Sequence, residues 1–303
     1  MTGPMTGPMT GPMTGAEPGS VVVGVDGTRH GDRALAWAVD YAAARHVPLC
    51  IVHGVGDLSG DRLPVPADAR ESLAGVSRRI TDQAVKLARG RAPGVDVTVH
   101  APFEDPRQAI LSVPDARMIV VGSRGRGVVT SLLLGSVSLA VLSHADCPVT
   151  IVRPSDGDAR PGAGDMVVGV DIDGSSREAL ELAFESAAGA ARSLVAVHAW
   201  SAHDTFVDSM SHLQRLELRD RHERRFGAAL ADLRGKYPDV PVTTQLVDER
   251  AVDALVHAST GAAVLVLGGR PHPRIPRYFG SVSRSVVEHA HCPVTVVRHS
   301  RQD

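Results

Sequence analysis

An internal duplication constrains this chain of 303 residues more than any other feature of its sequence. Four stretches of the first half recur in the second half in the same order, at a constant offset of 145 positions: VVVGVD at 21–26 with MVVGVD at 166–171, VHG at 52–54 with VHA at 197–199, LGSVS at 134–138 with FGSVS at 279–283, and DCPVTIVR at 146–153 with HCPVTVVR at 291–298. The period is far longer than the roughly 20–50 residues of solenoid repeats. The sequence therefore predicts two copies of one domain.

Composition sets the boundaries of these copies. Residues 1–19 contain repeats of MTGP and little that could be buried, so we expect a disordered tail. The first domain spans 20–154, and the second spans 165–299. Between them, residues 155–164 have the proline, glycine and polar composition of a linker. The tail offers several alternative start residues: Met1, Met5, Met9 and Met13.

Each copy alternates apolar runs with amphipathic stretches, which predicts α/β domains. Continuous apolar runs are typical of strands buried on both faces of a parallel sheet. The first copy has five expected strands, near 21–25, 49–53, 95–99, 118–121 and 149–152. Helical patterns separate them, including a long one at about 69–91. We therefore expect two tandem Rossmann-like domains, each a five-stranded parallel sheet flanked by helices.

A glycine-rich stretch, GSRGRGVVTSLLLGS at 122–136, marks the candidate ligand site. Such sheets bind ligands beyond the carboxyl ends of their strands, and Gly122 and Asp26 end two expected strands at that edge. The stretch leads into an expected helix that starts at Gly135. Amides at a helix N-terminus attract phosphate, and Ser136 and Ser138 could add hydroxyl donors. Asp26 could accept hydrogen bonds from ribose hydroxyls, or it could simply cap the turn after the first strand.

The spacing Gly-x2-Gly-x9-Gly-Ser, with VGVDG upstream and DCPVTIVR downstream, resembles the universal stress protein family over residues 20–299. It is similar to the ATP-binding branch, in the tandem form known from actinobacteria. The resemblance implies the strand order 3-2-1-4-5 and an ATP site at the first strand, the end of the second strand and the glycine loop. Carried over, that site comprises Asp26, Gly54 (through its backbone, to adenine), Gly122, Gly125, Gly135, Ser136, Val137 and Ser138.

The second copy has a degenerate loop, GGRPHPRIPRYFGS at 268–281. It is one residue shorter than the first, and Pro271 stands where the second glycine is expected. Proline removes amide donors, so both outcomes stay open for this half: a second ATP site, or none. The arginines of the loop could compensate: Arg270, Arg274 and Arg277. The retained candidate residues are Asp171, Gly268, Gly280, Ser281, Val282 and Ser283.

Histidines and cysteines outside this motif favour structural roles, and no catalytic or metal-ligating residue is assigned. His289 and Cys292 lie near an expected helix end and an expected core strand. His53 and His198 follow the second strand of each copy, where a structural or adenine-adjacent role is expected. His222 lacks the partner of an HExxH motif, and its run RLELRDRHERR is typical of a solvated helix face.

The overall charge and apolar pattern favour a cytoplasmic protein that binds neither nucleic acid nor membrane. The net charge is −2, no apolar stretch reaches the roughly 18 residues of a membrane span, and no secretory signal is evident. Three cysteines without a CxxC pattern favour reduced thiols. The expected fifth strands, 149–153 and 294–298, are sheet edges that could pair within the chain and then between chains in a homodimer.

These features predict a regulatory ATP-binding protein of a stress or dormancy response, with ATP bound with or without magnesium. No Gly-x4-Gly-Lys-Ser/Thr segment is present, and the two lysines, Lys86 and Lys236, lie away from the expected site. The phosphate-binding loop and the nearby lysine that fast phosphoryl transfer usually requires are therefore missing from the sequence pattern. Two alternatives stay open: a slow ATP-hydrolysing or adenylating enzyme, and a non-catalytic dimerisation scaffold.

Overall fold

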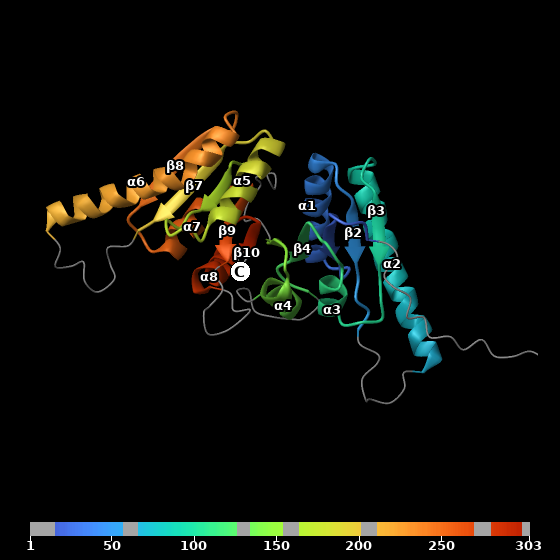
Figure 1. The fold of residues 1–303 in the computed structure, drawn as a ribbon. Coiled ribbons are helices and arrows are strands. Elements are labelled where there is room, and N and C mark those ends of the chain that lie inside the picture. The colour runs from blue at the N-terminus through green and yellow to red at the C-terminus, as the bar shows by residue number, and fades with distance from the viewer. Residues whose placement is uncertain are drawn as a thin grey trace, which may run out of the picture.

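The computed structural model describes residues 16–56, 66–125, 134–153, 164–200, 211–269 and 280–298 (Figure 1). The N-terminal half contains β1 (Val21–Gly24), α1 (Arg29–Arg45), β2 (Leu49–Val52), α2 (Ala67–Arg91), β3 (Val97–His100), α3 (Pro106–Leu111), β4 (Met118–Gly122), α4 (Ser136–His144) and β5 (Val149–Val152). The C-terminal half contains β6 (Met166–Gly169), α5 (Arg177–Gly189), β7 (Leu194–Ala199), α6 (His212–Lys236), β8 (Val242–Val247), α7 (Ala251–Ala258), β9 (Val264–Gly269), α8 (Ser281–His289) and β10 (Val294–Arg298).

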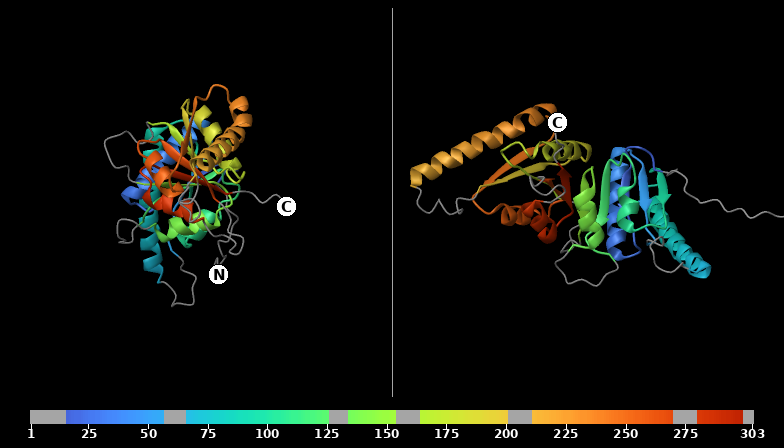
Figure 2. Two further views of the ribbon diagram at one scale, coloured as in Figure 1. Left: turned by 90° about the vertical axis from the view of Figure 1, so that its left-hand side faces the viewer. Right: turned by 60° about the horizontal axis from the view of Figure 1, so that its bottom comes forward.

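Both halves have the expected fold. The strand order is β3-β2-β1-β4-β5 in the first half and β8-β7-β6-β9-β10 in the second, and the strands within each half are parallel. The predicted order 3-2-1-4-5 is therefore confirmed. The two halves lie side by side, with α2 and α6 at opposite ends of the molecule (Figures 1 and 2).

The two sheets join into one ten-stranded sheet through β5 and β10, which pair antiparallel. The pairing expected within the chain is thus observed. Thr150 and Thr295, which are equivalent residues of the two copies, lie opposite each other, and their Oγ1 atoms are 2.8 Å apart. An approximate two-fold axis therefore passes between them, as in an isologous dimer.

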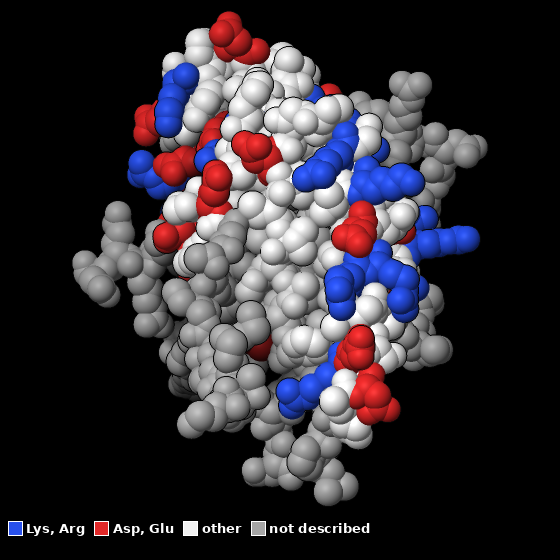
Figure 3. Space-filling model, turned by 90° about the vertical axis from the view of Figure 1, so that its right-hand side faces the viewer, with Lys and Arg blue, Asp and Glu red and all other residues white. Residues whose placement is uncertain are grey.

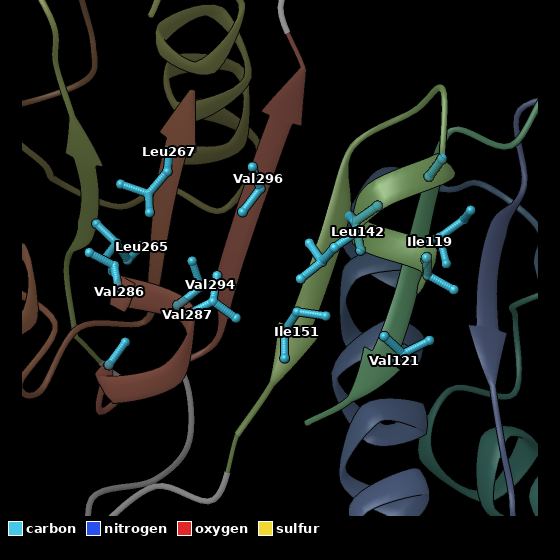
Figure 4. Packing of buried hydrophobic residues seen from close by; sticks show 14 of the residues in the cluster. Ile119, Val121, Leu142, Ile151, Leu265, Leu267, Val286, Val287, Val294 and Val296 are labelled. Atoms are coloured by element: carbon cyan, nitrogen blue, oxygen red, sulfur yellow. The ribbon is translucent and has the colours of Figure 1, made fainter. Parts of the chain in front are cut away.

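One apolar cluster continues across this junction on the side of α4 and α8 (Figure 4). Ile151 and Val294 lie on the paired strands, and Leu142 and Val287 reach them from the two helices. On the other side of the sheet, each half has its own cluster, and Trp37 of α1 packs against both. The halves therefore form one continuous body on one side and two cores that touch on the other.

Two arginines at equivalent positions make hydrogen bonds to the other half. Arg298 donates from Nη2 to two carbonyl oxygens in the last turn of α4, those of Leu142, at 3.2 Å, and Ser143. Its counterpart, Arg153, donates from Nη1 to the carbonyl oxygen of Val287 in the last turn of α8, at 2.9 Å. Each half thus satisfies a carbonyl group near the C-terminal end of a helix in the other half.

A few sequence-based boundaries need correction. Residues 16–19 were assigned to the tail, but the amide of Gly19 donates to the carbonyl oxygen of Asp115 at 2.8 Å and Ala16 packs against the core. The first three strands were expected near 21–25, 49–53 and 95–99; the structure ends β1 at Gly24 and β2 at Val52 and places β3 at Val97–His100. Residues 1–15 of the tail, residue 154 of the first domain and residues 155–163 of the linker lie outside the described residues.

No helix within the described ranges is both long and apolar enough to cross a membrane. On the face formed by the β3 and α2 side of the molecule, side chains of both charge signs are interspersed (Figure 3). This face therefore presents no field of a single sign, in line with the net charge of −2.

Candidate functional site

A cavity of about 360 Å³ opens at the carboxyl ends of β1, β2 and β4 in the N-terminal half. This volume lies in the range of small-molecule sites, roughly 300–1,000 Å³. All eight residues expected in this half line the cavity: Asp26, Gly54, Gly122, Gly125, Gly135, Ser136, Val137 and Ser138. The structure therefore gathers residues that are more than a hundred positions apart in the sequence.

Helix α4 points its N-terminus at this cavity. Its N-cap residue, Gly135, has no side chain that could accept from the first-turn amides, and Ser136 and Val137 line the cavity. Uncapped amides together with the helix dipole favour an anion at this end. The Ser138 hydroxyl was expected as a further donor, but it is buried and donates to the carbonyl oxygen of Gly122 at 2.7 Å. Its role is to tie the start of α4 to the end of β4.

Asp26 combines the two roles that were weighed from the sequence. Its Oδ1 accepts from the Thr28 amide at 3.0 Å and from the Thr28 hydroxyl at 2.7 Å, which makes an Asx turn. Its Oδ2 is directed toward the glycine loop, because a Cβ added to Gly125 would lie 3.1 Å from it. The turn therefore fixes the carboxylate in the wall of the cavity.

Two of the glycines are required by close approach of the chain. A Cβ on Gly54 would lie 2.4 Å from Cα of Pro106, the first residue of α3. A Cβ on Gly122 would lie 2.8 Å from the carbonyl oxygen of His30. Both contacts are with backbone atoms, which have little room to move, so these glycines bring the ends of β2 and β4 against α3 and α1.

Further residues line the cavity, among them His53, for which a structural or adenine-adjacent role was expected. His53 is buried, and its Nδ1 donates to the carbonyl oxygen of Val25 at 2.7 Å, so its tautomer is fixed. Arg124 lines the cavity beside Gly125. The apolar lining comes from several elements: Gly24, Val25, Gly31, Val52, Pro106, Ile110, Val121 and Leu134.

A second cavity, of about 480 Å³, occupies the same place in the C-terminal half. All six residues expected there line it: Asp171, Gly268, Gly280, Ser281, Val282 and Ser283. The strand register gives Gly268 the place of Gly122, because Met118 lies opposite Val21 and Val264 lies opposite Met166. The Ser283 hydroxyl donates to the carbonyl oxygen of Gly268 at 3.0 Å and so repeats the tie in the first half. Here too the expected hydroxyl donor is engaged by the backbone.

The helix start is also repeated, since Gly280 caps α8 without a side-chain hydrogen bond. The prolines and arginines of the degenerate loop, Pro271, Pro273, Pro276, Arg270, Arg274 and Arg277, lie outside the described residues. The same holds for the part of the first loop at 126–133.

The described walls of the two cavities differ at two places: the turn after the first strand of each half, and helix α6. Ser176 stands in place of Gly31, and its Oγ accepts from the Asp171 amide at 2.8 Å. Trp200 and His222 line the second cavity. His222 was expected on a solvated helix face, and this expectation was wrong for this residue. Its ring is stacked on that of His198, with the ring centroids 5.1 Å apart.

The histidines and cysteines near the helix ends have structural partners. His144 and His289 are the last residues of α4 and α8, and the Nδ1 atom of each lies within 3 Å of a carbonyl oxygen one turn back. Burial raises the pKa of the Cys147 thiol to about 11 and that of the Cys292 thiol to about 12. Both are therefore held as neutral thiols at pH 7. Among the described residues, no group of three or more His, Cys, Asp or Glu is arranged to hold a metal ion.

Comparisons with known proteins agree with this architecture. The universal stress protein family matches residues 19–153 and again 164–298. The universal stress protein Rv2005c of Mycobacterium tuberculosis is 34% identical over 289 residues, which cover 92% of this chain and 97% of that protein. The crystal structure of a universal stress protein from Archaeoglobus fulgidus covers 93% of this chain and 98% of its own, with a TM-score of 0.68 and 19% identity. A second structure from Archaeoglobus fulgidus, in complex with dAMP, covers 44% of this chain and 96% of its own, with a TM-score of 0.34 and 22% identity. The chain therefore belongs to the universal stress protein family, with two of the family's domains in tandem.

Proposed function

We propose that this protein is a regulatory binder of adenine nucleotides, with ATP as the ligand of the N-terminal cavity. The observation that carries this proposal is the start of α4. There an uncapped helix N-terminus meets a cavity of about 360 Å³ beside a fixed carboxylate, Asp26. This combination suits a ligand with an anionic part and a hydroxyl-bearing part, which a nucleotide provides.

In this proposal the parts of ATP follow the chemistry of the wall. The amides of Ser136 and Val137 would bind phosphate oxygens, with Arg124 as a cationic neighbour. Asp26 would accept from the ribose hydroxyls. The apolar surface near Gly54 and Ile110 would cover the adenine ring. Magnesium, where present, would be held mainly by the phosphates and water.

We propose a second adenine-nucleotide site in the C-terminal cavity. It keeps Asp171, the uncapped start of α8 and a larger volume of about 480 Å³. A proline in the loop removes one amide donor, so we expect weaker binding than in the N-terminal half. The regulatory role follows from linkage, because a nucleotide that binds one conformation better than another shifts the population toward it.

A matched pair of substitutions tests both sites. Gly135→Val and Gly280→Val each place a branched side chain at the N-cap, where the backbone φ values of −63° and −56° tolerate it. A Cβ at either glycine meets no atom closer than 3.5 Å among the described residues, so the fold should survive. Native mass spectrometry with ATP should then count one nucleotide fewer per chain in each variant. Unchanged counts and affinities in both would refute the proposal.

We also infer a cytoplasmic homodimer. The three cysteines are free thiols, as is typical of a reducing compartment. Strands β5 and β10 pair within the chain, while β3 and β8 end the ten-stranded sheet. A dimer of chains would therefore use a surface other than the fifth strands, and light scattering after size-exclusion chromatography would measure its mass.

A further inference from the structure

The wall of the C-terminal cavity contains two hydrogen-bonded imidazoles. Nε2 of His198, on β7, lies 2.8 Å from Nδ1 of His222, on α6. Both rings line the cavity, and so does Trp200, whose ring centroid lies 5.6 Å from that of His222. In the N-terminal half the position of His222 is occupied by Ser77. The imidazole pair therefore belongs to one half of the molecule.

The hydrogen bonds fix where the protons of the pair reside. Nδ1 of His198 lies 2.9 Å from the carbonyl oxygen of Val170, which can only accept, so this nitrogen carries a proton. In neutral His198 the other nitrogen, Nε2, then accepts from Nδ1–H of His222. Neutral His222 is left with an unprotonated Nε2. One additional proton can therefore bind to His222 without breaking either hydrogen bond.

The surroundings keep this extra proton off while the cavity holds no anion. Burial is the main cause that lowers the pKa of His222; the interaction with His198 and the positive charges of Arg225 and Arg221 act in the same direction, while Asp171 acts in the opposite direction. These groups come from β7, from α6 itself and from the end of β6. Helix α5 and strand β8 also pack on α6, but they place no group among those that shift the pKa of His222.

We propose that the His198–His222 pair is a ligand-responsive element of the C-terminal cavity, in which His222 takes up one proton from solvent when an anionic adenine nucleotide binds. This inference rests on the proposed function of that cavity. A negative charge in the cavity favours the imidazolium form of His222. By linkage, a ligand that favours protonation binds more tightly to the protonated site. The C-terminal site therefore binds its nucleotide more tightly as the pH falls.

Trp200 makes a local test feasible. The chain has two tryptophans, so a Trp37→Phe background leaves Trp200 as the single indole, in the wall of the C-terminal cavity. ATP would be titrated at pH 8 and pH 6 while Trp200 emission is followed, with His222 intact and with His222→Asn. Asparagine can still donate to His198, but it does not titrate. Protonation of ATP itself is common to both proteins and cancels in the comparison.

With His222 present, the gain in affinity from pH 8 to pH 6 should exceed that of the Asn variant by about three- to tenfold, because each unit of pKa shift on binding corresponds to a factor of ten. Equal pH dependence in the two proteins would overturn this inference and leave the proposed nucleotide binding intact. If Trp200 emission stays constant at both pH values and native mass spectrometry counts one nucleotide per chain, both the inference and the second nucleotide site are wrong.

A second measurement uses a chain with no substitution at position 222. Nitrogen NMR of labelled histidine should show the pKa of His222 rising when ATP is added, while Nδ1 of His198 keeps its proton and donates it to the Val170 carbonyl oxygen. A pKa of His222 that is the same with and without bound ATP would overturn the inference, whatever the stability of the Asn variant.

Discussion

The N- and C-terminal halves share one backbone plan but line their cavities with different side chains. In the N-terminal half, Gly31 and Gly54 contribute only backbone atoms to the cavity wall. Ser77, the counterpart of His222, lies buried on α2. In the C-terminal half, an imidazole and an indole face the cavity, from His222 and Trp200. The comparison teaches that duplication preserved the helix N-terminus and the strand-end carboxylate, while the wall opposite them changed its chemistry.

The largest expected effect tests the close approach in the N-terminal half. Gly54→Ala places a Cβ 2.4 Å from Cα of Pro106, which must move. We expect a loss of about 3 kcal/mol in the free energy of unfolding, measured by urea denaturation. The matched control is Ala199→Gly, since Ala199 already carries a Cβ at the same place. If Gly54→Ala proves no more costly than the control, the two halves do not differ in packing there.

The second prediction concerns the interdomain hydrogen bonds. Arg298→Ala removes a charged donor from the Leu142 and Ser143 carbonyl groups of α4 and should cost about 2 kcal/mol of unfolding free energy. Arg153→Ala should cost a similar amount, because it removes the equivalent donor from Val287 of α8. Thermal and urea denaturation of both variants would show whether the two arginines contribute equally to stability; a large inequality in the loss of unfolding free energy would contradict this prediction.

A smaller effect is expected at the centre of the junction. Thr150→Val leaves the buried hydroxyl of Thr295 without this partner and should cost about 1 kcal/mol. The double substitution with Thr295→Val removes both hydroxyls and should cost less than the sum of the two single changes. A double-mutant cycle measures this coupling, and strictly additive costs would show that the hydroxyl pair contributes nothing.

The smallest expected effect is the pH dependence of stability without ligand. The folded state lowers the pKa of His222 below its unfolded value, mainly through burial. The unfolded chain therefore binds more protons between the two pKa values, and the C-terminal half should lose stability as the pH falls below about 6.5. The His222→Asn variant should lose less over the same range in urea denaturation. Parallel pH curves would assign the loss to other groups.

Much of the fold could be predicted from residues alone. Apolar runs such as Val21–Val23 predict buried strands, and the constant offset between the copies indicates that both halves have the same fold. The strand order was predicted from the resemblance to a family, because the sequence of a parallel strand does not indicate which strands lie next to it in the sheet. The pairing of β5 with β10 was foreseen as a use of free edges. Its antiparallel register was not, since it depends on contacts between the halves.

The candidate site divides in the same way. The glycine and serine positions followed from spacing and strand-end geometry, and the structure gathers them in two cavities. The hydroxyls of Ser138 and Ser283 were misjudged because their acceptors, the strand-end carbonyls, become neighbours only after folding. His222 was hidden in a charged run. Its spacing of four residues from Phe226 and eight from Leu230, which are both buried, is the signal that could have placed it on the inner face of α6.

Because of the arginine contacts across the junction, the helix at each cavity is held by residues of both halves. The cavity-facing end of α4 belongs to the first half, whereas Arg298, from the second half, donates hydrogen bonds near its opposite end. The same arrangement, reversed, holds α8 through Arg153. Cutting the chain in the linker and separating the two halves would remove the hydrogen bonds of Arg298 and Arg153 together. The tandem form is thus part of how the helix that begins at each cavity is kept in position, rather than a simple doubling of the number of cavities.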